Sequence, residues 1–112
     1  MPVSDNGTVF DIYGNDDRPV IALVHGLGLT RATWDGHIPH LAEHYRVLNY
    51  DLYGHGDSPP PPRRPNLSLF AEQLAELMDE LAIAQSAIVG FSLGGMINRR
   101  FTMDFPARVW AL

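Results

Sequence analysis

The sequence predicts an α/β fold in which helices cover both faces of a mostly parallel sheet. Residues 19–24 and 86–90 are continuous apolar runs, the pattern of strands that are buried on both faces. Strands of this kind that alternate with amphipathic helices are typical of parallel sheets. A glycine-rich turn directly follows each of the two runs. Because ligands bind at the carboxyl ends of the strands in such sheets, we expect the functional site at these turns.

The first half of the chain contains three predicted strands and one predicted helix. Residues 8–13 are rich in β-forming side chains and precede a polar turn, which predicts the first strand. Residues 19–24 form the second strand. Residues 34–45 carry apolar side chains at helical spacing, and Pro39 lies early enough for a helix to tolerate it. Residues 46–50 form the third strand.

The second half continues the alternation of helices and strands. A helix is predicted over residues 68–82, with the serine at 68 as its N-cap, because the apolar side chains share one face. Residues 86–90 form the fourth strand, and residues 96–104 form a helix that ends before Pro106. Residues 107–112 begin another apolar strand, which leaves an open sheet edge that favours association.

Two other patterns have a structural explanation that we prefer. Residues 59–65 contain five prolines and two arginines, which favours a stiff surface loop; recognition by a proline-binding domain is the alternative. His37, His40 and His44 fall on one face of the predicted helix, but no cysteine or pair of acids completes a metal site there. We therefore expect no bound metal and no cofactor.

The bulk composition limits the classes of partner. The 112 residues fit one small domain, and a net charge of −5 without a basic cluster disfavours nucleic acid. The chain has no cysteine, and residues 1–10 lack the apolar segment of a signal peptide. No apolar run approaches the roughly 20 residues that span a membrane. We expect a cytoplasmic protein that takes a small-molecule substrate and binds neither nucleic acid nor membrane.

The turn after the fourth strand carries the strongest chemical signal. Residues 90–94 read Gly-Phe-Ser-Leu-Gly, which matches the pattern G-x-S-x-G, and Gly95 follows. In a strand-to-helix turn this pattern holds a serine on a strained backbone, and small residues at Gly90 and Gly94 prevent clashes. The hydroxyl is then exposed at a helix N-terminus, where backbone dipoles favour negative charge. We interpret Ser92 as a nucleophile rather than as a helix cap.

The second glycine-rich turn reads His-Gly-Leu-Gly and directly follows the second strand. Its glycines, Gly26 and Gly28, let a backbone N–H approach the same edge of the sheet. We expect the N–H groups of Leu27 and Leu93 to form an oxyanion hole, a pair of donors for negative charge that develops during a reaction. We interpret His25 as a structural residue that shapes the loop; a role as general base is the alternative.

A third turn-rich segment, residues 51–58, reads Asp-Leu-Tyr-Gly-His-Gly-Asp-Ser. Its glycine, aspartate and serine residues are typical turn formers, whose side chains bond to nearby backbone. We interpret this segment as a rigid loop beside the cleft. A catalytic role for His55 or Asp57 is the alternative.

Taken in this order, the three segments resemble the α/β-hydrolase family. The resemblance covers nearly the whole chain and includes Trp34 and the Phe-Pro-Ala-Arg-Val stretch at 105–109. Within the family, the chain is similar to the small esterases, lactonases and cofactor-free haloperoxidases. The resemblance implies that Ser92 is the nucleophile, that Leu27 and Leu93 donate to the oxyanion, and that carboxylic esters or lactones are hydrolysed through an acyl-enzyme. A serine in the turn argues against dehalogenases and epoxide hydrolases, which carry aspartate there.

The chain departs from the family pattern after Ser92. In this family the triad acid and histidine follow the serine. Here Asp104 is the only acid after Ser92, and no histidine follows. The resemblance therefore implies that residues 1–112 are the N-terminal part of one α/β-hydrolase domain, incomplete at the C-terminus and without the lid and the last strands.

Three hypotheses about activity remain at this point. In the first, the chain is a piece of an ester or lactone hydrolase in which a histidine outside these residues activates Ser92. In the second, it is a non-catalytic half-domain that associates with a copy of itself or a partner through its open sheet edge. In the third, an upstream histidine such as His25 acts as the base within the chain.

Overall fold

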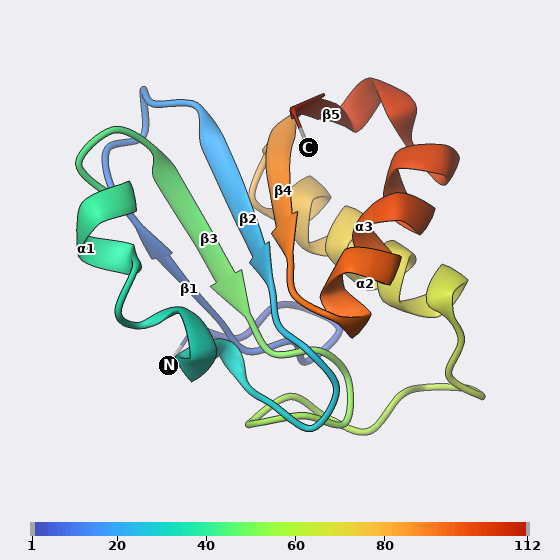
Figure 1. The fold of residues 1–112 in the computed structure, drawn as a ribbon. Helices are drawn as coiled ribbons and strands as arrows, with labels where there is room; N and C mark the ends of the chain where they lie inside the picture. The colour runs from blue at the N-terminus through green and yellow to red at the C-terminus, as the bar shows by residue number, and fades with distance from the viewer. Residues whose placement is uncertain (1, 112) are drawn as a thin grey trace.

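A computed structural model describes residues 2–111 and shows one mixed five-stranded sheet (Figure 1). The strand order is β1-β3-β2-β4-β5. The strands β2 to β5 run parallel to one another, and β1 pairs antiparallel with β3 at one edge of the sheet. The strands are β1 (Phe10–Tyr13), β2 (Val20–Val24), β3 (Arg46–Tyr50), β4 (Ser86–Gly90) and β5 (Val109–Ala111). The predicted α/β fold with a mostly parallel sheet is confirmed.

The centre of the sheet is buried because β2 is apolar on both of its faces. All five residues of this strand are buried. Ala22 and Val24 face the larger core, whereas Ile21 and Leu23 face a smaller core on the opposite side. This alternation follows from the two-residue repeat of a strand and explains why a continuous apolar run was the correct signal.

Helices cover both faces of the sheet, as predicted. The long helices α2 (Leu67–Glu80) and α3 (Leu93–Asp104) pack on one face over the larger core (Figure 1). The short helices η1 (Arg31–Trp34) and α1 (Ile38–Leu41) lie on the other face over the smaller core. None of the helices between residues 2 and 111 has the length and apolar character needed to cross a bilayer.

The helix predicted over 34–45 and the strand predicted over 107–112 differ most from the structure. The single helix predicted over 34–45 is wrong: η1 and α1 replace it, with a turn at Gly36 between them. Glycine disfavours a helix interior, and Pro39 lacks the N–H that a continuous helix would need, so a new helix starts at Ile38 with the proline in its first turn. At the end of the chain η2 (Pro106–Arg108) precedes β5, so the last strand starts later than predicted. Leu112 lies outside the described residues.

The long helices begin earlier than predicted. The N-cap of α2 is Asn66 rather than Ser68, and its side-chain oxygen accepts the N–H of Leu69 at 2.8 Å. This bond satisfies one of the N–H groups that a helix leaves without a partner. The other helix, α3, begins at Leu93 instead of residue 96, directly after Ser92. The serine therefore lies at the very start of a helix.

Replacing the N-cap tests this assignment. We expect Asn66→Ala to lower the free energy of unfolding by about 1 kcal/mol, because an N–H of the first turn loses its acceptor. Ser68→Ala is the matched control and should change it by less than about 0.5 kcal/mol. Urea denaturation of both variants measures the difference. A larger loss in Ser68→Ala than in Asn66→Ala would contradict the assignment.

Candidate active site

The turn at Phe91 and Ser92 joins β4 directly to α3. Ser92 has φ 58° and ψ −111°, a backbone conformation that residues with a side chain avoid. Among the described residues, Ala82 is the only other residue besides the glycines that has a positive φ. Ser92 is exposed, and its side chain makes no capping hydrogen bond to the helix. The hydroxyl is therefore displayed at the helix N-terminus without serving as a cap.

Two glycines make this tight turn sterically feasible. A Cβ at Gly94 would overlap the carbonyl oxygen of Val24, and a Cβ at Gly90 would overlap the carbonyl of Gly94. These neighbours are backbone atoms, which cannot move aside as the end of a flexible side chain can. A Cβ at Gly95, by contrast, would meet nothing closer than 3.7 Å. The geometry requires glycine at positions 90 and 94 but not at position 95.

The loop that follows β2 lies beside this turn. Val24 is the register partner of Gly90 in the parallel pair of strands, so both loops leave the sheet at the same edge. The N–H of Phe91 donates to the carbonyl of Val24 at 3.1 Å. A Cβ at Gly26 would lie 3.1 Å from the ring of Phe91, so the two loops are in close contact.

The two predicted oxyanion donors lie on the neighbouring segments that follow β2 and β4. Leu93 is the first residue of α3, where a helix leaves its N–H groups without an intrahelical acceptor. Leu27 lies in the loop after β2, next to Gly28, whose φ of +77° favours glycine. Within residues 2–111, neither N–H donates to another protein group. Both donors are therefore available to an external acceptor, as an oxyanion hole requires.

His25 lies fully buried beneath the same loop, with both ring nitrogens engaged. Its Nδ1 lies 2.8 Å from the carbonyl oxygen of Gly26, and its Nε2 accepts the N–H of Leu52 at 3.0 Å. One nitrogen faces an acceptor and the other a donor, so the ring is neutral with its hydrogen on Nδ1. Burial lowers the pKa of His25 and favours the same neutral state. No ring nitrogen is left for Ser92, which favours the interpretation of His25 as a structural residue over the hypothesis that it is the base.

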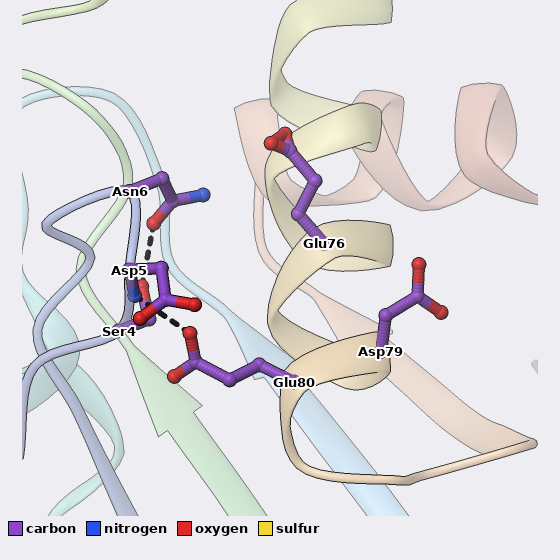
Figure 2. Close-up of a pocket in the computed structure, with 6 residues that line it drawn as sticks. All are labelled: Ser4, Asp5, Asn6, Glu76, Asp79 and Glu80. Carbon is purple, nitrogen blue, oxygen red and sulfur yellow. Dashed lines mark hydrogen bonds between the residues drawn. The ribbon is translucent and has the colours of Figure 1, made fainter.

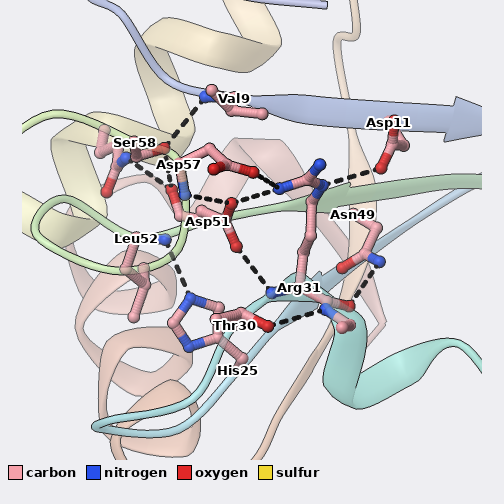
Figure 3. Close-up of polar contacts among 12 residues, drawn as sticks. Val9, Asp11, His25, Thr30, Arg31, Asn49, Asp51, Leu52, Asp57 and Ser58 are labelled. Carbon is pink, nitrogen blue, oxygen red and sulfur yellow. Dashed lines mark hydrogen bonds and ion pairs between the residues drawn. The ribbon is translucent and has the colours of Figure 1, made fainter. Parts of the chain in front are cut away.

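An ionic network that the sequence analysis missed lies next to these loops (Figure 3). Asp51 is fully buried, pairs with the guanidinium of Arg31, and accepts the backbone N–H groups of Arg31 at 2.7 Å and Asp57 at 3.0 Å. Arg31 also contacts the carboxylates of Asp11 at 2.8 Å and Asp57 at 3.2 Å. Burial alone would lower the pKa of Arg31, but its hydrogen bonds to the three aspartates raise the pKa above its ordinary value.

Residues 51–58 surround this network as a tightly bonded loop. The hydroxyl of Ser58 donates to the carbonyl of Asp51 at 2.7 Å. The buried side chain of Gln73, from α2, donates to the same carbonyl at 3.2 Å and accepts the N–H of Tyr53 at 3.1 Å. These bonds tie the loop to its own backbone and to a helix, as the interpretation of a rigid loop predicts.

The two side chains considered as catalytic alternatives are both held inside this region. His55 places Nδ1 3.0 Å from the carbonyl of Tyr53, and its ring centroid lies 5.1 Å from that of His25. Asp57 is bonded to Arg31. Their contacts explain both residues as parts of the loop.

A separate acidic hollow lies between the N-terminal turn and α2 (Figure 2). Within it the backbone N–H of Asp5 donates to the carboxylate of Glu80 at 2.6 Å, and Asp79 pairs with Arg108 at 2.8 Å. The residues that line it are Ser4, Asp5, Asn6, Glu76, Asp79 and Glu80. None of them belongs to the turn at Ser92 or to the loop after β2, so we place the candidate active site at those two segments instead.

Comparison with known protein families shows the family to which this chain belongs. A family model described as the alpha/beta hydrolase fold matches residues 19–112. The chain belongs to the α/β-hydrolase fold family. The match includes all three turn-rich segments and the helices on both faces of the sheet.

Individual α/β-hydrolase relatives are similar over most of this chain. The 3-oxoadipate enol-lactonase 2 of Acinetobacter baylyi is 30% identical over 108 residues, which cover 96% of this chain and 40% of that protein. The pimeloyl acyl-carrier protein methyl ester esterase of Aeromonas hydrophila is 36% identical over 95 residues, which cover 84% and 36%. The crystal structure of a hydrolase from Pseudomonas aeruginosa has a TM-score of 0.89 and 33% identity, covering 96% and 42%. The chain thus spans less than half the length of each.

Within residues 2–111, the one acid that follows Ser92 lies away from the turn. Asp104, the only acid after the turn, is the last residue of α3 and pairs with Arg100 at 3.0 Å. A helix rises 1.5 Å per residue, so Asp104 lies about 16 Å along the axis from Leu93, at the end remote from Ser92. No histidine follows Ser92 in the sequence. At this turn the described residues therefore place a serine and two available N–H groups.

The steric requirement at the turn can be tested with two neighbouring glycines. We expect Gly94→Ala to lower the free energy of unfolding by about 1–3 kcal/mol, because the new methyl group would meet the Val24 carbonyl. Gly95→Ala should leave it unchanged or raise it by up to about 1 kcal/mol, because alanine favours a helix. Chemical denaturation of the two variants measures both effects. Equal losses would show that the close contact is not the cause.

The ionic network gives a second prediction. We expect Arg31→Met to lower the free energy of unfolding by about 3–5 kcal/mol, because the fully buried carboxylate of Asp51 loses its counter-charge. Arg63→Met is the matched control: its pair with Glu72 is exposed, so the expected loss is about 0–1 kcal/mol. Thermal and urea unfolding measure the two values. A loss in Arg31→Met no greater than in the control would contradict the role of the network.

Proposed function

We propose that this chain carries the nucleophile and the oxyanion donors of a serine hydrolase that acts on carboxylic esters or lactones. The observation that carries the proposal is the exposed Ser92 on a strained backbone at the start of α3. Similarity to proteins named as an enol-lactonase and a methyl ester esterase supports the substrate class.

In the proposed reaction, Oγ of Ser92 attacks the acyl carbonyl carbon of the substrate. The carbonyl oxygen becomes a tetrahedral oxyanion, which accepts the N–H groups of Leu27 and Leu93. The N-terminal end of the α3 dipole adds further stabilisation of this negative charge. Collapse of the intermediate expels the alcohol, or opens the lactone ring, and leaves an acyl-enzyme that water hydrolyses.

The proton of Ser92 needs an acceptor that then returns it to the departing alcohol oxygen, and we assign this role to a histidine outside residues 1–112. His25 is engaged on both nitrogens, and His55 is bonded within its loop. The order serine, acid, histidine of this family supports the same assignment.

Association through the open edge of the sheet is the alternative function. Here β5 pairs with β4 alone and forms one edge of the sheet, and Trp110 is partly exposed on it. An association role would place no demand on the backbone of Ser92 or on Gly90 and Gly94. The hydrolase proposal explains these features, so we prefer it.

A serine-directed probe tests the proposal. We expect a fluorophosphonate to modify the full-length gene product at Ser92 alone, as located by mass spectrometry of its peptides. Ser92→Ala should abolish the labelling and lower kcat for p-nitrophenyl acetate by at least about 10³-fold. Ser68→Ala is the matched control and should label like the unmodified protein. Labelling at another serine, or unchanged kcat in Ser92→Ala, would overturn the proposal.

A further inference from the structure

His25 takes no part in the proton transfers of the proposed reaction, yet its ring is fully buried and contacts the loops on both sides of it. We propose that His25 is a positioning residue that sets the direction of the Leu27 N–H. This inference rests on the proposed function, in which that N–H donates to the oxyanion.

The argument starts from a single peptide group. The carbonyl oxygen of Gly26 and the N–H of Leu27 belong to the same peptide bond, and no cis peptide occurs among the described residues. In a planar trans peptide these two groups point in opposite directions. Whatever holds the Gly26 carbonyl therefore also aims the Leu27 N–H.

Two donors hold that carbonyl in place. The Nδ1–H of His25 donates to it at 2.8 Å, and the backbone N–H of Leu29 donates at 3.1 Å. The His25 ring is fully buried, so the carbonyl points towards the interior. The N–H of Leu27 consequently points away from the interior, on the side where its own side chain is 73% exposed.

The loop at residues 51–58 selects the tautomer that makes this bond possible. Leu52 donates its N–H to Nε2 of His25 at 3.0 Å, and a hydrogen on Nε2 would face that N–H directly (Figure 3). The proton therefore stays on Nδ1, where it can reach Gly26. Two titratable groups, His55 and Asp51, also act on this ring, the first lowering its pKa and the second raising it, but burial is the largest effect and favours the neutral ring.

The ionic network extends the same chain of contacts. Leu52 follows Asp51 directly, and Asp51 is fixed by Arg31 and by the side chain of Gln73. The position of the Leu52 N–H is thereby set by buried charge and by α2. This explains how a loop without a catalytic side chain still influences the oxyanion donor.

Two substitutions of His25 each remove one of the two hydrogen bonds of its ring and keep the other. In His25→Asn the side-chain amide lies near the position of Nδ1 and can still donate to Gly26, whereas the bond to Leu52 is lost. In His25→Gln the side-chain oxygen reaches the position of Nε2 and can still accept from Leu52, whereas the bond to Gly26 is lost. Each variant loses one buried hydrogen bond, so a purely structural role predicts similar losses of stability and activity.

The positioning role predicts unequal kinetics in the full-length gene product. With p-nitrophenyl acetate, we expect kcat of His25→Gln to fall about 10- to 100-fold with KM within about twofold, the signature of a lost transition-state interaction. His25→Asn should keep kcat within about threefold of the unmodified protein. Melting temperatures of both variants verify that each is folded under assay conditions. Equal kcat values in the two variants, or a lower value in His25→Asn, would overturn the inference.

The activity of Ser92→Ala, measured beside the two His25 variants, distinguishes a failure of the His25 role from a failure of the proposed function. If Ser92→Ala abolishes activity while His25→Asn and His25→Gln behave alike, the hydrolase proposal stands and the role of His25 fails. If Ser92→Ala stays active, the hydrolase proposal and the role of His25 both fail.

Nitrogen-15 spectra of the unmodified protein give a test that does not depend on the folding of a variant. At pH 7 they should show a protonated Nδ1 and an unprotonated Nε2 in His25. The opposite tautomer, or a doubly protonated ring, would overturn the inference.

Discussion

The candidate site depends on one close contact between backbones, where the start of α3 meets the end of β2. Gly94 lies so near the carbonyls of Val24 and His25 that no side chain fits between them. The contact holds the first turn of the helix against the sheet and forces Ser92 into its unfavourable conformation, at a cost of about 1–3 kcal/mol. The fully buried Ile97 and Phe101 anchor the rest of α3 in the core and offset that strain.

The same contact brings two independent loops to one edge of the sheet. Each loop is then made rigid by a different kind of interaction: steric exclusion around Ser92, and buried polar bonds around His25 and Asp51. A buried carboxylate is costly unless it is paired and hydrogen-bonded, and Asp51 meets both conditions through Arg31. Rigid donors need no rearrangement when charge develops on a substrate, which is the main source of their value in catalysis.

Local patterns predicted the framework of the fold and the position of the turn. The strands β2 and β4 were found because continuous apolar runs are typical of strands buried on both faces, and the glycines around Ser92 followed from the backbone that such a turn demands. Local patterns failed where tertiary contacts decide. The ionic network joins Asp11, Arg31 and Asp51, which lie 20 positions apart along the chain, and charged residues ordinarily indicate surface. The tautomer of His25 depends on an N–H donated from position 52, which no local pattern shows.

The close contact that fixes Ser92 and the two loops leads to one expectation: during the reaction, the oxyanion lies within hydrogen-bond distance of both predicted donors. The most direct test is a crystal structure of the protein after reaction of Ser92 with a phosphonate, whose oxygen occupies the place of the oxyanion. The account predicts that this oxygen lies about 2.7–3.1 Å from the N–H nitrogens of both Leu27 and Leu93, with the φ of Ser92 still positive. A phosphonate oxygen directed away from either nitrogen, or a Ser92 with a negative φ, would contradict it.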